Sequence, residues 1–393
     1  MHMITVMITG LAMGSTVLIG RAVGAKDQRG AAQAAGNTAT MFFALSAVLT
    51  LGLLAFVKPV VEVMATPDPA VPGTVSYLTI CFAGIPFITA YNVISSVFRG
   101  MGDTRSPMYF VAVACGLNIA LDYLFIGALQ SGAAGAALGT TLSQTASVLI
   151  SCAAIKKKKM IPGMERQDFY PRKQICSSIL KVGVPVALQD GFIQVSFILI
   201  TVFANRRGIS DAAAVGIVEK LIGILFLVPS TMLSCVSALA AQNIGAGKHD
   251  RARELLKDAI LITVVFGIGA SFLMQLFAEE EVALFATSKD VIARGGQYMR
   301  GYVWDCIFAG IHFCFSGYFC AYGLSQISFL HNAVSIVCAR IPLSYAASVY
   351  FAGTLFPMGL AAPAGSALSV AVCLAAFQWM NRRGGENGKN NSG

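Results

Sequence analysis

Long runs of apolar residues dominate this chain and leave few structures open to it. The stretches 41–57, 75–97, 175–204 and 259–277 approach or exceed the ~20 residues with which a helix crosses a bilayer. A membrane barrel needs alternating polar and apolar residues, and these stretches lack that pattern. Helices satisfy their own backbone hydrogen bonds within lipid. The sequence therefore predicts an all-α integral membrane protein.

The composition agrees with a chain that crosses the membrane many times. Only 12% of its residues are charged, against roughly 25% in soluble domains, and the mean hydropathy is +0.71. We predict about 11 transmembrane helices, at residues 1–20, 34–57, 74–97, 107–128, 133–155, 176–204, 211–237, 256–277, 291–319, 326–350 and 356–381.

The formal net charge of +9 indicates topology rather than a nucleic-acid partner. Most of the 28 basic residues lie in alternate polar loops, near 21–29, 99–105, 156–181 and 248–257, and in the tail after 381. Cytoplasmic loops carry such an excess of Lys and Arg. We therefore expect a multi-pass protein of the plasma (inner) membrane with a cytoplasmic C-terminus and lipid, but no nucleic acid, as a partner.

An internal repeat divides the chain into two lobes. A shift of 221 residues, without gaps, places Gly24 on Gly245, Tyr77 on Tyr298 and Gly102 on Gly323. Repeated helical bundles are typical of secondary transporters. The expected organisation is an N-terminal lobe at 1–155, a cytoplasmic polybasic linker at 156–175, a C-terminal lobe at 176–381 and a disordered tail at 382–393.

The repeat also predicts that the first lobe is incomplete. Met1 aligns with Ile222, yet the second lobe already begins near Cys176. We therefore expect two lobes of six helices each, of which the first helix and the start of the second are missing from the N-terminal lobe.

Several motifs resemble the multidrug and toxic compound extrusion (MATE) family across essentially the whole chain. They are GRAVGAKDQRGAAQAA at 20–35, FRGMGDTRSP at 98–107, NIALDYLFI at 118–126, VGVPVALQ at 182–189 and AQNIGAGKHDRAREL at 241–255. The resemblance implies a twelve-helix antiporter that exports small, cationic, amphipathic compounds. It also implies Na⁺ or H⁺ as the coupling ion, no further cofactor, and a monomer.

Asn118 and Asp122 are the strongest site candidates. An ionisable residue within a membrane helix is costly and marks a functional site by default. Asn118 and Asp122 are four residues apart and share one helix face, where their oxygens suit Na⁺ or a proton. In the family that the chain resembles, such a pair belongs to a cation site with a threonine of the next helix, which corresponds to Thr140. The alternative is that the pair only bridges neighbouring helices.

Four ionisable residues of the C-terminal lobe form a second set of candidates, namely Asp190, Glu219, Lys220 and Asp305. They fit either a second cation or substrate site, or a buried ion-pair network in which Glu219 or Lys220 faces Asp190 or Asp305. Arg340, just before Pro342, is expected to extend its charged end to the membrane interface.

Tyr91, Trp304 and Phe308 are candidates for a substrate cavity, because aromatic rings attract organic cations. The alternative is that these rings serve only in packing. Two other functions compete with an exporter. A flippase for a lipid-linked saccharide would need more intramembrane basic residues than Lys220 and Arg340. A membrane-embedded enzyme would need a motif such as H-E-x-x-H or G-x-S-x-G, and the sequence contains neither.

Overall fold

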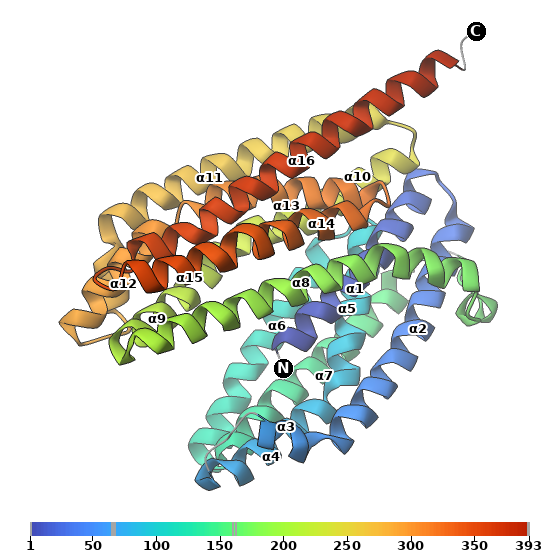
Figure 1. Cartoon of the computed structure of the whole chain (residues 1–393). Helices are drawn as coiled ribbons and strands as arrows, with labels where there is room; N and C mark the ends of the chain where they lie inside the picture. Colours follow the sequence, from blue (N-terminus) through green and yellow to red (C-terminus); the bar gives the residue numbers. More distant parts are fainter. Residues whose placement is uncertain (1, 64–67, 159–160, 162, 391–393) are drawn as a thin grey trace. The chain divides into compact units, whose positions relative to one another are not determined.

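The computed structural model describes residues 2–63, 68–158, 161 and 163–390, which are helical apart from short connections (Figure 1). Nine of the described helices are long and apolar enough to cross a membrane, or up to 11 if each of two bent pairs counts as one span. The bent pairs are Asp68–Ala83 with Ile85–Gly100, and Lys289–Tyr302 with Asp305–Ala321. The prediction of an all-α membrane protein is thus confirmed, with 9 to 11 candidate spans among the described residues.

The chain divides into two compact units. Unit 1 contains Met1–Ala187 and Gly245–Gly247, and unit 2 contains Leu188–Ile244 and Lys248–Gly393. The division falls inside the helix α8 (Lys173–Arg207), beyond the linker predicted at 156–175. Its physical reason is that the first turns of α8 pack on unit 1.

Unit 1 is built on a central contact between its first and fifth helices. Apolar and small residues of α1 face α5 and α2, while α7 packs on α4, α5 and α6. Thr9 of α1 donates a hydrogen bond to Asn92 of α5 at 2.9 Å. The helices of this unit are α1 (His2–Gly24), α2 (Gln28–Ala55), α3 (Val57–Val63), η1 (Asp68–Ala70), α4 (Val71–Ala83), α5 (Ile85–Gly100), α6 (Arg105–Asp122), η2 (Tyr123–Ala128), α7 (Gly132–Lys158) and η3 (Arg166–Phe169).

Two glycines bring the beginning of α8 against α1. A β-carbon at Gly14 would overlap the carbonyl oxygen of Ile179, and one at Gly183 would overlap that of Leu11. Small residues let membrane helices approach this closely. The contact explains why residues up to Ala187 belong to unit 1.

Unit 2 has the larger aromatic core. Tyr298, Tyr302 and Phe319 are fully buried, and α16 packs along both α12 and α13. Besides the rest of α8, the helices of this unit are α9 (Ile209–Leu225), α10 (Leu227–Gly245), α11 (His249–Ala283), α12 (Lys289–Tyr302), α13 (Asp305–Ala321), α14 (Ser325–Ser335), η4 (Ile336–Arg340), α15 (Ile341–Tyr350) and α16 (Phe356–Asn390).

Helix ends repeat at the offset of 221 residues found in the sequence. The helix α1 ends at Gly24 and α10 at Gly245, α2 begins at Gln28 and α11 at His249, and α5 ends at Gly100 and α13 at Ala321. The loops after α5 and α13 also match, because Gly102 and Gly323 have positive φ angles of 88° and 72°. Glycine adopts this left-handed conformation without the steric cost of a β-carbon.

The end of the predicted linker folds onto α2. Asp168, in the short helix η3, is fully buried and accepts hydrogen bonds from Arg29 at 3.2 Å and from the Glu165 backbone at 2.9 Å. Asn37 of α2 donates to the Asp168 carbonyl at 3.0 Å and accepts from the Arg172 backbone at 2.6 Å. Residues 159–160 and 162 of the linker lie outside the described residues.

The last helix continues beyond its predicted end at 381, as α16 runs to Asn390. Residues 391–393 of the tail lie outside the described residues, and the disorder of the tail stays a prediction.

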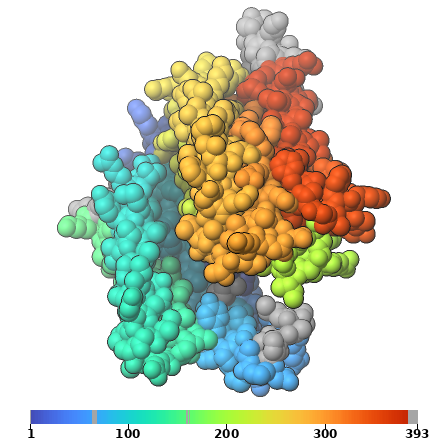
Figure 2. Space-filling view, turned by 90° about the vertical axis from the view of Figure 1, so that its left-hand side faces the viewer, coloured from blue at the N-terminus to red at the C-terminus, as the bar shows by residue number. Residues whose placement is uncertain are grey.

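Apolar side chains cover much of the outer surface. The helix α11 (gold in Figure 2) exposes residues such as Leu261, Val265, Phe272 and Leu276 along its length. In water this surface would be unfavourable. In a membrane, the same apolar side chains contact lipid acyl chains, which agrees with the 9 to 11 candidate spans among the described residues.

Candidate functional site

Asn118 and Asp122 occupy the last turn of α6, immediately before a change in helix geometry. The six residues of η2 that follow form a π-helix, in which the Leu129 N–H donates to the Leu124 carbonyl. Short π-helical segments within helices occur frequently at functional sites. Both predicted side chains are half-buried.

Gly139 of α7 faces this turn and makes room for it. A β-carbon at position 139 would overlap Oδ1 of Asp122 and lie 3.6 Å from Nδ2 of Asn118. Neither Oδ1 of Asp122 nor Nδ2 of Asn118 has a hydrogen-bond partner within the part of the chain that the structure describes. Buried polar atoms are normally paired, so this turn can accept a bound ion, a proton or water.

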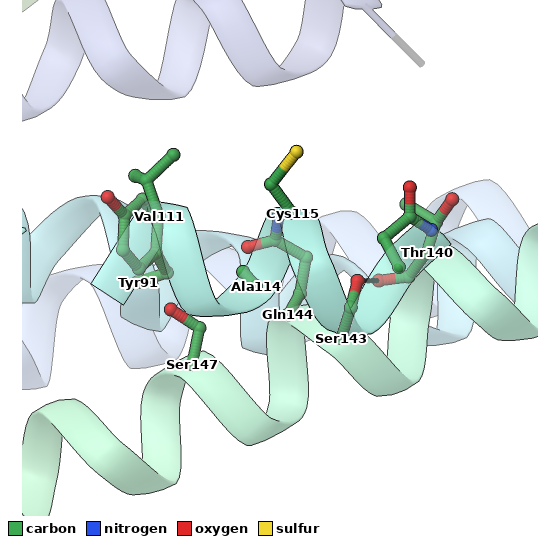
Figure 3. A pocket seen from close by; sticks show the side chains of 9 residues that line it. Tyr91, Val111, Ala114, Cys115, Thr140, Ser143, Gln144 and Ser147 are labelled. Atoms are coloured by element: carbon green, nitrogen blue, oxygen red, sulfur yellow. Dashed lines mark hydrogen bonds between the residues drawn. The ribbon is translucent and has the colours of Figure 1, made fainter. Parts of the chain in front are cut away.

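A cavity of about 230 Å³ adjoins the turn between α5, α6 and α7. Figure 3 shows Tyr91 on α5, Val111, Ala114 and Cys115 on α6, and Thr140, Ser143, Gln144 and Ser147 on α7. Asn118 of α6 completes the lining of this cavity. The structure therefore brings Asn118, Thr140 and Tyr91 to one cavity, whereas Asp122 lies beside it; their role in binding a cation stays a prediction.

The cavity offers neutral oxygens. Thr140 donates its hydroxyl to the Ala136 carbonyl at 3.1 Å, and Ser143 donates to the Thr140 carbonyl at 2.8 Å. Their oxygen lone pairs remain available as acceptors. Together with the Asp122 carboxylate one turn from Asn118, the arrangement suits a hard cation, which prefers oxygen ligands.

Unit 2 contains a separate buried cluster of charged residues. Asp305, at the start of α13, is 1% exposed, and neither of its carboxylate oxygens has a hydrogen-bond partner among the described residues. Glu219 of α9 accepts a hydrogen bond from Thr201 at 3.3 Å through Oε2, whereas Oε1 has no such partner. Both carboxylates lie within electrostatic reach of Arg340.

Arg340 is buried, so the prediction that it extends to the membrane interface was wrong. It is 8% exposed, donates a hydrogen bond to the Tyr302 hydroxyl, and lies 4.7 Å from the centre of the Phe197 ring. Its position at the end of the π-helix η4 (Ile336–Arg340) and the aromatic rings that cover it explain the burial. Sequence reasoning missed its partner Tyr302 altogether.

Asp190 and Lys220, the other two candidates of the C-terminal lobe, lie outside the cluster around Arg340. Lys220 is exposed, Asp190 is half-buried, and neither belongs to the contacts around Arg340. Asp190 adjoins Gln189, which accepts a hydrogen bond from Ser328 at 2.6 Å. The network expected around Glu219 and Asp305 is therefore centred on Arg340 instead.

The predicted aromatic residues divide between the two units. Tyr91 lines the cavity of unit 1 and lies 3.5 Å from the Pro107 carbonyl. In unit 2, Trp304 is 41% exposed and Phe308 is half-buried on the first turn of α13. Their common role in a substrate cavity stays a prediction.

The MatE family model matches residues 1–124 and 185–346 of the chain. Among curated relatives, the probable multidrug resistance proteins YoeA and YpnP of Bacillus subtilis are 25% and 28% identical over 94% and 86% of this chain. These alignments cover 82% and 75% of the two relatives. The multidrug export protein MepA of Staphylococcus aureus is 25% identical over 78% of this chain and 67% of its own length.

Solved structures share the fold. A mutant of the Vibrio cholerae MATE transporter VcmN has a TM-score of 0.90 at 18% identity, over 97% of this chain and 86% of that chain. A MATE structure in complex with MaL6 has a TM-score of 0.89 at 22% identity, over 97% of this chain and 85% of that chain. The missing first helix stays a prediction. The matched family model, the relatives and the fold agree: the chain belongs to the MATE family of multidrug efflux transporters.

Proposed function

We propose that this chain is a secondary antiporter that exports small organic, cationic and amphipathic compounds in exchange for Na⁺ or H⁺. Two lobes would expose the binding sites alternately to the two sides of the membrane, as in other transporters with repeated bundles. Asn118, Asp122 and Thr140 bind the coupling cation in unit 1. We place the C-terminus in the cytoplasm of a bacterial-type inner membrane and treat the protein as a monomer.

The observation that supports this proposal most strongly is the unpaired carboxylate oxygen of Asp122. It lies in a turn that Gly139 keeps open, one turn along α6 from Asn118 and next to a cavity lined by hydroxyl groups. A buried charge without a partner is costly. A cation or a proton at Asp122 removes that cost, so binding and release of the ion can change the stability of one state relative to another.

Substrate recognition is assigned to aromatic and acidic side chains. Tyr91, Trp304 and Phe308 would contact flat organic cations through their rings. Glu219 and Asp305 provide acidic side chains in unit 2 for a second cation or for the substrate. Asp190 and Lys220 are the remaining candidates of the C-terminal lobe.

A flippase for a lipid-linked saccharide is the alternative transporter. Such a substrate carries phosphate and would require free basic side chains within the membrane. Arg340 is buried beside two carboxylates, and Lys220 is exposed apart from them. This charge balance favours cationic rather than anionic substrates. The family assignment sets the membrane-embedded enzyme aside.

The test is an accumulation assay with ethidium in cells that lack their own exporters. Cells that express the chain should accumulate less dye than empty cells. Asp122→Asn should restore full accumulation, because the amide can neither bind a proton nor neutralise a cation. Asp258→Asn is the matched control, since the exposed Asp258 of α11 undergoes the same chemical change.

Equal membrane amounts of both variants make the comparison valid. An Asp122→Asn variant that exports as well as the parent would refute the assignment of the coupling site. If a broad dye panel shows no export and a lipid-linked saccharide precursor builds up on deletion of the gene, the flippase alternative is correct.

A further inference from the structure

The buried charges of unit 2 consist of two acids and one base. Asp305 and Glu219 are the acids, and Arg340 is the base whose charge acts on both of them. The three residues come from α13, α9 and η4, so the fold rather than local sequence brings them together. The cluster lies wholly within unit 2.

Arg340 is held in place by aromatic side chains. Its guanidinium lies 4.7 Å from the centre of the Phe197 ring and 5.7 Å from that of Tyr302, and it donates to the Tyr302 hydroxyl. Cations stack favourably on such ring faces. The guanidinium nevertheless makes no direct ion pair with either carboxylate within the described part of the chain, and its Nε has no hydrogen-bond partner there.

The carboxylates are likewise incompletely paired. Oε1 of Glu219 lacks a hydrogen-bond partner among the residues described, and the Asp305 oxygens lack one of standard geometry there, although the Ser366 hydroxyl interacts with the Asp305 carboxylate. Unpaired buried oxygens from two acids are the ligands that a hard cation would take. Arg340, however, already supplies a positive charge that acts on both carboxylates, and in a low-dielectric interior this charge repels a second cation.

The repeat shows that this arrangement is particular to unit 2. At the offset of 221 residues, Asn118 and Asp122 of unit 1 correspond to Ala339 and Leu343, and Ile119 corresponds to Arg340. The same helix of the repeat therefore carries an acid in unit 1 and a base in unit 2. The two units thus differ in the sign of the charge that this helix presents.

We propose that Arg340 is a built-in counter-cation that excludes Na⁺ from Asp305 and Glu219, so that unit 2 provides no Na⁺ site in this chain. Tyr302 contributes by accepting the Arg340 hydrogen bond, which engages an oxygen that an ion would otherwise use. This inference deepens the proposed function, because it confines any Na⁺ coupling to unit 1. It depends on ion binding alone and not on which compound is exported.

Trp304 gives a direct readout, because it precedes Asp305 and the chain has only 2 tryptophans. In the purified full chain with Trp379→Phe, fluorescence is titrated with NaCl against choline chloride at constant ionic strength. We expect no saturable Na⁺ response. Adding Arg340→Gln should create a saturable response, and adding Asp305→Asn to that variant should remove it. Arg340→Lys, which keeps the charge, should give no response and is the matched control.

Two outcomes overturn the proposal. One is a saturable Na⁺ response of the Trp379→Phe chain that Asp305→Asn abolishes. The other is a folded Arg340→Gln chain that gains no response.

A second measurement does not depend on the folding of the Arg340 variant. Radioactive Na⁺ binding is measured on Asp122→Asn, in which the proposed site of unit 1 is removed. We expect no saturable binding. Residual binding that disappears with Asp305→Asn would place an Na⁺ site in unit 2 and contradict the proposal. The dye assay with Asp122→Asn is a separate experiment, so failure of the proposed export function is recognised independently.

Discussion

Gly139 of α7 lies directly against the carboxylate of Asp122 at the end of α6. A β-carbon at position 139 would overlap Oδ1 and lie 3.4 Å from Cγ of the same carboxylate. The backbone of α7 therefore shapes the space around Asp122 without contributing a side chain. The position of the carboxylate depends on the absence of a side chain at position 139.

Gly139→Ala should impair export without removing any ionisable group. Overpacking of a close contact typically costs about 1–3 kcal/mol. When the added methyl group displaces the Asp122 carboxylate and this energy is lost from ion binding, the affinity for the ion falls about tenfold. Ethidium accumulation at matched expression measures the effect. Gly116→Ala on α6 is the control, because nothing lies within 4 Å of a β-carbon there. Equal export by the two variants would show that the Gly139 contact has no role in the site.

The sequence predicted the residues of α6 but not the surface opposite them. Asn118 and Asp122 follow from helical spacing and from the cost of a charge in lipid, and Thr140 follows from the family resemblance. Gly139 adjoins that threonine in a stretch rich in Gly and Ala, where no pattern distinguishes a contact glycine from a small residue that faces lipid. Its role depends on the crossing of α6 and α7, which is a tertiary feature.

Arg340 was predicted to reach the membrane interface, but the structure buries it. An arginine near a proline and a helix end is ordinarily expected to reach the membrane interface. The burial arises because α12 and α8 bring Tyr302 and Phe197 to it, and both are far away in sequence. The repeat could have supplied a warning, since the corresponding helix of unit 1 holds Asp122 within the membrane.

The contact of the linker with α2 should contribute measurably to stability. Asp168→Asn removes the ion pair with Arg29 and weakens the bond from the Glu165 backbone. Losing hydrogen bonds to a buried charged group costs about 1–3 kcal/mol each, so the Tm of the purified protein should fall. Asp250→Asn is the control, because the Asp250 side chain is 97% exposed and its ion pair among the described residues is with the partly exposed Arg253. An unchanged Tm in Asp168→Asn would show that the linker contact does not support the fold.

Two glycines control the packing of α12 on α16. A β-carbon at Gly359 would overlap the Tyr298 carbonyl oxygen, and it would lie 3.0 Å from the Tyr302 backbone nitrogen and 3.2 Å from Cα of Gly301. Gly359→Ala must separate the helices or strain them, at about 1–3 kcal/mol. A fall in Tm is expected, whereas Gly269→Ala on α11 should have no effect because its β-carbon would meet nothing within 4 Å. Equal melting of both variants would argue against close packing of α12 on α16.

Asp211 forms ion pairs with two arginines of unit 2. The carboxylate is 2% exposed and pairs with Arg207 and Arg294, each at 2.6 Å. Arg207 in turn donates to the carbonyls of the loop after α15, including Phe351 at 3.1 Å. Asp211→Asn leaves a buried guanidinium without its counter-charge, a change that costs about 3–5 kcal/mol, so the Tm should fall by more than in Asp290→Asn. Asp290 is the suitable control because it pairs with the same Arg294, at 2.9 Å, from a side chain that is 55% exposed. Should both variants melt alike, Arg207 must be stabilised by its carbonyl acceptors alone.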